Sequence, residues 1–184
     1  TDNIIPNLLK DGRKMYAYHF EGYWKDVGTI SSLWEANMEV LDPEHSGINL
    51  FDENWKIYSR NSGMTGHKIG SNAVVENCMI TDGCRIDGNV KHSILFSGVK
   101  VEKGAKVEDA VVMGGTVIKA GAVVEHCIVA ENVVIGENAI VGSMPKDEGH
   151  GVATIGSGIT IGKGAKIGPN AMVNKNVEDG EEQW

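Results

Sequence analysis

Aliphatic residues recur at every fifth or sixth position through the last two thirds of this 184-residue chain. This spacing matches neither the period of an α-helix nor the alternation of a simple β-strand, and it indicates a repeat architecture. The segments VKHSIL, VEDAVV and VEHCIV begin 17 residues apart, which predicts coils of 17 or 18 residues with three short strands each. The repeated positions are Ile69, Val75, Ile80, Ile86, Val90, Leu95, Val101, Val107, Val112, Ile118, Val124, Val129, Ile135, Val141 and, after a gap, Ile155, Ile161, Ile167 and Val173.

A second regularity accompanies the first, because an alanine often lies four residues after a repeated aliphatic residue. Such a position is typical of a crowded corner that admits only a small side chain. Burial of three inward aliphatic side chains stabilises one coil by about 5–9 kcal/mol, whereas ordering its 17 residues costs about 25 kcal/mol. A single coil is therefore unstable, and the coils must stack in order to fold. The alanines are Ala73, Ala105, Ala122, Ala139, Ala165 and Ala171.

The composition agrees with a β-rich repeat and argues against several classes of protein. Glycine supplies 24 residues and proline 4, and 41% of the residues are hydrophobic, which is unlike collagen and unlike a disordered chain. The net charge of -8, without a basic cluster, argues against a nucleic-acid partner. No apolar run is long enough for a membrane span, so we expect no membrane partner. Three cysteines without a CxxC pair favour a reducing, cytoplasmic location.

The chain divides into two parts of different composition. Nine of the eleven aromatic residues lie before residue 60, whereas 20 of the 24 glycines lie from Gly63 onward. We therefore expect an α+β segment over 1–58, a linker over 59–68, the repeats over 69–178 and a tail over 179–184. Within the first segment the hydrophobic spacing predicts helices over 4–9 and 30–41, the second with a capping box of Ser32 and Glu35, and a strand over 15–20.

The repeat resembles that of the hexapeptide-repeat family, whose chains wind into a left-handed parallel β-helix with three flat sheets. The resemblance implies a mainly β fold, in which a left-handed parallel β-helix follows a small α+β remnant of another domain. Residues 143–154, with the sequence SMPKDEGHGVAT, break the period. They are polar and contain Pro145, so we expect a loop extruded from one corner of the β-helix.

The segment GYWKDVGT, from Gly22 to Thr29, is followed by WEAN, from Trp34 to Asn37. Together they resemble the C-terminal edge of the catalytic domain in sugar-1-phosphate nucleotidyltransferases. The version with Trp-Lys-Asp-Val-Gly-Thr is similar to the glucose-1-phosphate adenylyltransferase branch of that family, whose members carry a C-terminal left-handed β-helix. Both parts of the chain thus point to one family.

This resemblance implies an activity and a set of site residues. The reaction is ATP plus glucose 1-phosphate giving ADP-glucose and pyrophosphate, a step of glycogen biosynthesis. Family members hold a catalytic Mg²⁺ with two acidic residues, one of which matches Asp26, and a carboxylate is a suitable hard ligand for this ion. Tyr23, Trp24 and Gly28 match residues that shape the sugar-phosphate pocket, and Lys25 is a further candidate there.

Other family features are missing or altered. We find no Gly-rich phosphate loop, so we expect this chain alone to be inactive, as the C-terminal portion of a longer enzyme. The family implies a homotetramer in which the β-helix serves assembly and allosteric regulation. Thr65 and Gly66 replace the usual Pro-Pro pair before the first coil, and Arg60, His67 and Lys68 are candidates to bind a phosphorylated effector.

Two other functions compete with this one. Another sugar-1-phosphate nucleotidyltransferase, such as a mannose-1-phosphate guanylyltransferase, would share both the segment and the β-helix. A hexapeptide-repeat acyltransferase would need a histidine as general base, and His150 in the extruded loop is the candidate. That function leaves the first 58 residues unexplained. We expect Cys78 and Cys127 to be inert packing residues, and His92 and His126 to stack in a surface ladder rather than to bind a metal.

Overall fold

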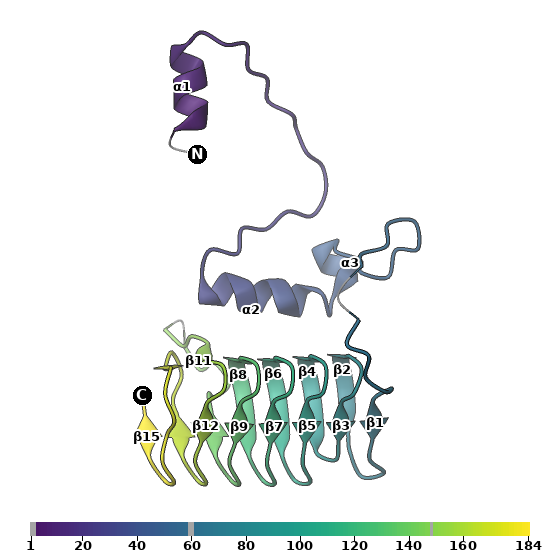
Figure 1. The fold of residues 1–184 in the computed structure, drawn as a ribbon, viewed down its shortest axis with the longest axis vertical. Coiled ribbons are helices and arrows are strands. Elements are labelled where there is room, and N and C mark those ends of the chain that lie inside the picture. Colours follow the sequence, from purple (N-terminus) through teal and green to yellow (C-terminus); the bar gives the residue numbers. More distant parts are fainter. Residues whose placement is uncertain (1–2, 59–60, 148) are drawn as a thin grey trace.

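The computed structural model describes residues 3–58, 61–147 and 149–184. A parallel β-helix occupies the region from residue 68 to residue 183 (Figure 1). One sheet runs in the order β1-β3-β5-β7-β9-β12 along one side of the coils. Its strands are two residues long: β1 (Lys68–Ile69), β3 (Arg85–Ile86), β5 (Lys100–Val101), β7 (Val117–Ile118), β9 (Val134–Ile135) and β12 (Thr160–Ile161).

The other strands form a sheet in the order β15-β13-β10-β8-β6-β4-β2, to which β11 and β14 are attached. Its members are β2 (Val75–Ile80), β4 (Asn89–Leu95), β6 (Lys106–Val112), β8 (Val123–Val129), β10 (Ile140–Val141), β11 (Ala153–Ile155), β13 (Lys166–Ile167), β14 (Met172–Val173) and β15 (Glu182–Gln183). Strand β8 pairs with β10 over its first residues and with β11 over its last. The long strands therefore cover two sides of each coil, and the third side belongs to the first sheet.

The long strands turn a corner at one residue each. Asn77, His92, Asp109 and His126 have φ angles of 47°, 42°, 53° and 44°, in the left-handed region that residues other than glycine seldom adopt. The prediction of three short strands per coil is confirmed, although two of the three are continuous in the middle coils. The corner residues lie on the outside of the β-helix, where their side chains are available for contacts.

The interior contains the repeated aliphatic residues. From Ile86 to Val173 every one of these repeated positions is buried, and all the predicted corner alanines except Ala73 are buried with them. Ile69 is 46% exposed because the first coil has a neighbour on one side only. The prediction of a mainly parallel β-helix is confirmed, and its left hand stays a prediction of the resemblance. In the region expected as a tail, β15 pairs with β13.

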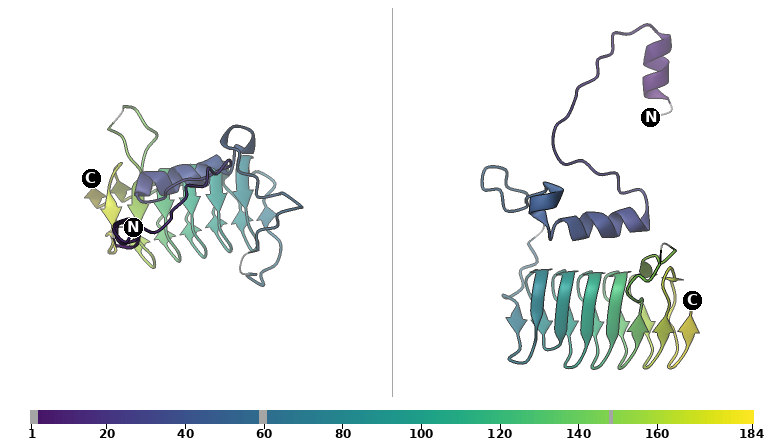
Figure 2. Two further views of the ribbon diagram at one scale, coloured as in Figure 1. Left: turned by 90° about the horizontal axis from the view of Figure 1, so that it is seen from above. Right: turned by 180° about the vertical axis from the view of Figure 1, so that it is seen from behind.

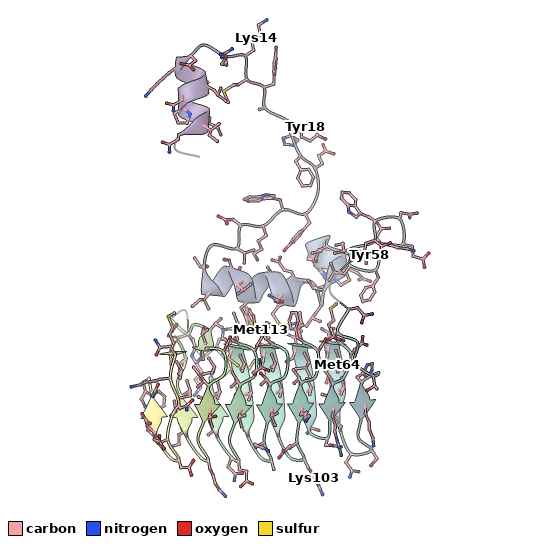
Figure 3. All side chains as sticks on the ribbon, viewed as in Figure 1. Lys14, Tyr18, Tyr58, Met64, Lys103 and Met113 are labelled. Atoms are coloured by element: carbon pink, nitrogen blue, oxygen red, sulfur yellow. The ribbon has the colours of Figure 1, made fainter. Side chains whose placement is uncertain are left out.

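The N-terminal part contains α1 (Ile4–Lys10), α2 (Ile30–Glu39) and α3 (Pro43–Ser46). The helices predicted over 4–9 and 30–41 are confirmed. The strand predicted over 15–20 is wrong, because residues 13–20 pair with no strand in the described part of the chain and their aromatic side chains are exposed. An isolated extended segment lacks the ladder hydrogen bonds that define a strand. Figure 3 shows Tyr18 on this extended segment, away from the β-helix.

None of the helices in the described ranges is both long and apolar enough to cross a bilayer. Helix α2 lies against the β-helix, across the ends of β4, β6 and β8 (Figures 1 and 2). The described residues of the loop expected over 143–154, namely 143–147 and 149–152, form no strand and leave the regular coils, which agrees with an extruded loop, whereas Ala153 and Thr154 already belong to β11.

Candidate active-site segment

An apolar stripe on the outside of the β-helix fixes the position of α2. In VKHSIL, VEDAVV and VEHCIV the fifth residue points outward, yet Ile94, Val111 and Ile128 are all buried. Val111 and Ile128 form a cluster with Val152 and with Met38 of α2, and four further apolar side chains pack against it from the N-terminal part. These are Ile30, Leu33, Trp34 and Leu41. Burial of this apolar surface is the force that docks α2.

Two polar features orient α2 on this stripe. The indole Nε1–H of Trp34 donates a 2.8 Å hydrogen bond to the backbone carbonyl of Asp109, one of the corner residues. Thr29 is the N-cap, and its side chain and that of Ser32 form a reciprocal capping box. The expected box of Ser32 with Glu35 is therefore wrong, because the helix begins at Ile30 and Ser32 already occupies the N3 position. Thr29, the last residue of GYWKDVGT, thus ends the segment and starts the helix.

Side chains of GYWKDVGT alternate between two directions, as in any extended chain. Tyr23 and Lys25 point to α2, where Glu39 receives both: the Tyr23 hydroxyl donates to Oε2 at 2.6 Å, and Lys25 Nζ donates to Oε1 at 2.6 Å. Lys25 Nζ also lies 3.0 Å from Glu35 Oε2. Trp24, 75% exposed, and Asp26, also exposed, make no such contacts. Of these four predicted site residues, Tyr23 and Lys25 are therefore held against α2, whereas Trp24 and Asp26 are exposed.

These contacts determine the protonation of Tyr23, Lys25 and Glu39. The hydrogen bonds from Lys25 and then Tyr23 hold the pKa of the Glu39 carboxyl below its usual value. The same carboxylate raises the pKa of the Lys25 ammonium and that of the Tyr23 hydroxyl. At neutral pH Glu39 is therefore a carboxylate that accepts from an ammonium and from a neutral phenol.

Asp26 is the candidate ligand for Mg²⁺. Its carboxylate forms no hydrogen bond or ion pair with any residue in the described ranges, so both oxygens are available. Those ranges contain no cluster of three or more acidic, histidine or cysteine side chains able to hold a metal. One free carboxylate fits an ion that binds one or two protein carboxylates together with substrate phosphates. Asp26 therefore fits Mg²⁺ as a partial site.

Glycine has different roles at the two ends of the segment. Gly22 has a φ of 147°, and a Cβ there would approach the Phe20 ring to 2.9 Å, so this turn favours glycine. A Cβ on Gly28 would meet Asp26 Oδ1 at 3.6 Å, an ordinary contact. The backbone at Gly28 therefore does not require glycine. Gly28 suits a pocket residue because it lies beside the Asp26 carboxylate.

Two of the three candidate effector residues, His67 and Lys68, lie at the first coil. Arg60 lies outside the described residues, and His67 and Lys68 are exposed. Lys68 is in register with Arg85 on β3, and Arg85 with Lys100 on β5. Arg85 also pairs with Asp87 at 3.0 Å. Sequence reasoning missed Arg85 and Lys100, although each is the first residue of a two-residue strand, a position that the repeat could have identified.

The histidines do not form the simple ladder that the repeat predicts. His92 Nδ1 pairs with Asp109, while His126 is only 7% exposed and meets the Trp34 ring edge-on at 4.5 Å between centroids. The ring centroid of His150 lies 6.2 Å from that of His126, and His150 Nε2 lies 2.7 Å from the Ser143 carbonyl oxygen. Because a carbonyl only accepts, this nitrogen carries the proton, which opposes a general-base role for Nε2 of His150 in acyl transfer.

Cys84 and Cys127 are buried free thiols, and Cys78 is half-buried. Burial raises the pKa of all three. This environment agrees with the expectation that Cys78 and Cys127 pack without reacting, because the thiolate is the reactive form.

Comparison with known proteins gives matches to both parts of the chain. The family described as "GlmU-like, C-terminal hexapeptide" matches residues 62–162, and the family described as "Nucleotidyl transferase" matches residues 1–43. Curated relatives include the glucose-1-phosphate adenylyltransferases of Bacillus mycoides (strain KBAB4) and Bacillus cereus (strain ATCC 10987 / NRS 248). Each is 55% identical over 102 residues, covering 55% of this chain and 27% of the relative. The match therefore spans about a quarter of the length of these relatives.

Proposed function

Because the chain belongs to the GlmU-like C-terminal hexapeptide family, we propose that it is the C-terminal part of a sugar-1-phosphate nucleotidyltransferase. The observation that carries this proposal is the attachment of GYWKDVGT to the β-helix through α2, which leaves Asp26 and Trp24 exposed on the side away from the helix. The match of residues 1–43 to the nucleotidyl transferase family supports the same conclusion.

The substrates are ATP and glucose 1-phosphate, and the products are ADP-glucose and pyrophosphate. A phosphate oxygen of the sugar attacks the α-phosphorus of ATP, and pyrophosphate leaves as that oxygen bonds. Mg²⁺, when bound, neutralises charge on the phosphates. Asp26 contributes one carboxylate to hold the ion, while Trp24 and Gly28 border the sugar-phosphate pocket and Tyr23 and Lys25 support its wall. The names of the Bacillus relatives favour glucose and ATP over mannose and GTP.

A pyrophosphate-release assay tests this function on the gene product that carries this chain. With Mg²⁺, ATP and glucose 1-phosphate we expect release of pyrophosphate, and Asp26→Asn should lower turnover by about 100-fold or more, as expected when a group that stabilises transition-state charge is lost. Faster reaction with GTP and mannose 1-phosphate would indicate the guanylyltransferase instead. A folded product with no activity on any sugar 1-phosphate would refute the proposal.

We further propose that the β-helix is an assembly and regulatory module, with a homotetramer as the assembled form in the cytoplasm. Support comes from apolar side chains that remain exposed on the coils, such as Val74 and Met172, and from the cations of Lys68, Arg85 and Lys100 in one row. Light scattering measures the assembly, and the response of activity to phosphorylated sugars measures the regulation. A monomer that ignores these compounds would refute this second proposal.

A further inference from the structure

We propose that Glu39 is a positioning residue that clamps Tyr23 and Lys25 to α2, and that Lys25 acts through this clamp rather than by contacting the sugar phosphate. The inference deepens the proposed function and rests on it, because the clamp presents Asp26 to that reaction. It assigns a role to Glu39, which lies two residues beyond the WEAN segment.

The first support is the convergence of two donors on one carboxylate. Each oxygen of Glu39 receives one of them, the Tyr23 hydroxyl or the Lys25 ammonium, both at 2.6 Å. Charge-assisted hydrogen bonds of this length are among the stronger polar contacts in proteins. Residues 23 and 25 are therefore tied to the same point, which fixes the backbone that leads into Asp26.

The second support is the charge around Lys25. Its ammonium lies between Glu39 at 2.6 Å and Glu35 at 3.0 Å, and its side chain is only 20% exposed. The two carboxylates together outweigh the single positive charge. A phosphate approaching from the pocket would therefore meet an ammonium whose charge is already neutralised, whereas a phosphate-binding lysine needs an available charge.

The third support is the position of Glu39 on α2. The preceding residue, Met38, is buried against Val111 and Ile128 of the β-helix, so α2 cannot turn without losing this contact. Glu39 thus lies on a helix of fixed position, and its carboxylate contacts Tyr23 and Lys25 from that helix. Because the apolar contact of Met38 holds α2 in place without this carboxylate, and the Glu39 side chain is still 34% exposed, we expect the clamp to affect the position of Asp26 far more than folding.

A double-mutant cycle in the gene product tests the assignment of Lys25. We expect Glu39→Gln and Lys25→Met each to lower kcat about 10-fold, to raise the Mg²⁺ concentration for half-maximal rate, and to change the KM for glucose 1-phosphate little. The double variant should be no slower than either single variant, because both remove the same contact. Glu44→Gln, at an exposed position in α3, is the matched control and should resemble the wild type.

The cycle has outcomes that overturn the inference. If the two effects multiply, or if Lys25→Met mainly raises the KM for glucose 1-phosphate, Lys25 contacts the substrate directly. If Glu39→Gln leaves kcat and the Mg²⁺ dependence unchanged, Glu39 does not position Asp26. Should Glu39→Gln fail to fold, Glu39→Asp retracts the carboxylate by one methylene and takes its place in the cycle.

A second measurement is independent of activity and uses the 184-residue chain. Acylation of lysines by an amine-reactive ester, followed by mass spectrometry, should modify Lys25 roughly threefold faster in Glu39→Gln, because the Lys25 side chain, only 20% exposed, loses the ion pair at 2.6 Å that holds it against α2 and becomes more accessible to the reagent. Lys14, on the extended segment (Figure 3), is the internal standard. An unchanged rate at Lys25 overturns the clamp. If the wild type shows no turnover, the proposed function fails while this rate still decides the clamp.

Discussion

The β-helix offers two buried isoleucines whose removal should have separate consequences. Ile128 on β8 is 3% exposed and points outward to α2, whereas Ile155 on β11 is fully buried and points inward. The two strands are paired side by side. Ile128→Ala and Ile155→Ala therefore remove the same atoms from neighbouring sites, one between α2 and the β-helix and one within the coil.

The expected magnitude follows from burial. Truncating a fully buried isoleucine to alanine costs about 2–5 kcal/mol, and we take about 2–4 kcal/mol for Ile128 because α2 can partly close the gap. This loss falls on the docking of α2, since Ile128 contributes to the outer cluster and not to the interior. The undocked population should rise by about 30- to 700-fold, at 1.4 kcal/mol for each factor of ten.

Hydrogen exchange with mass spectrometry resolves the two effects. In Ile128→Ala, peptides from α2 should lose protection while those from β6 and β9 keep it; in Ile155→Ala, protection of the coils should fall. The reasoning is refuted if Ile128→Ala exposes the coils as much as Ile155→Ala does and leaves α2 unchanged, because the outer stripe would then not be what holds the helix.

Other properties can be tested on the same chain. Without the gene product's remaining residues, this chain should release no pyrophosphate from ATP and glucose 1-phosphate with Mg²⁺, and clear activity would contradict the assignment of the phosphate loop to another part of the enzyme. Burial lowers the pKa of His126, although the negative charge of Asp109 partly opposes this shift. The folded state therefore binds fewer protons at this group than the unfolded state. The stabilisation by neutral His126 should be complete above about pH 6.5 and lost as the pH falls through the lowered pKa. The protection factors of α2, which compare its hydrogen exchange with the intrinsic rate at each pH, should fall in that range, and should fall less in His126→Gln. Because burial raises the pKa of the Cys84 and Cys127 thiols, a thiol reagent should modify them only after unfolding; rapid labelling of the native chain would contradict this.

The sequence allowed the β-helix interior to be predicted because each inward position has the same requirement. A residue such as Val107 or Val124 must be aliphatic to fill its layer, and its neighbours in the adjacent coils are aliphatic for the same reason. Repetition thus supplies independent evidence for each position. A short segment such as residues 15–20 has no such support, since its alternation suits a strand but cannot indicate whether a partner strand is present.

The candidate site could be predicted only in part, because its support is tertiary. GYWKDVGT identified Asp26 and its neighbours, but nothing in the spacing indicated that Glu39 would meet Tyr23 and Lys25. The docking of α2 was closer to being predictable. The fifth residue of VKHSIL, VEDAVV and VEHCIV is aliphatic in all three, although it points outward and would be polar on a solvated surface.

The outward faces of the β-helix differ in a way that explains where α2 lies. On the face formed by the first halves of the long strands, outward positions carry ion pairs, such as Lys106 with Glu108 and Glu125, both at 2.8 Å. Such a ladder favours contact with water. The next face presents Ile94, Val111 and Ile128, and exposing these apolar side chains to water would cost free energy. Because α2 covers this face with Met38 and holds Tyr23 and Lys25 of GYWKDVGT through Glu39, the helix connects the segment that carries Asp26 to the coils.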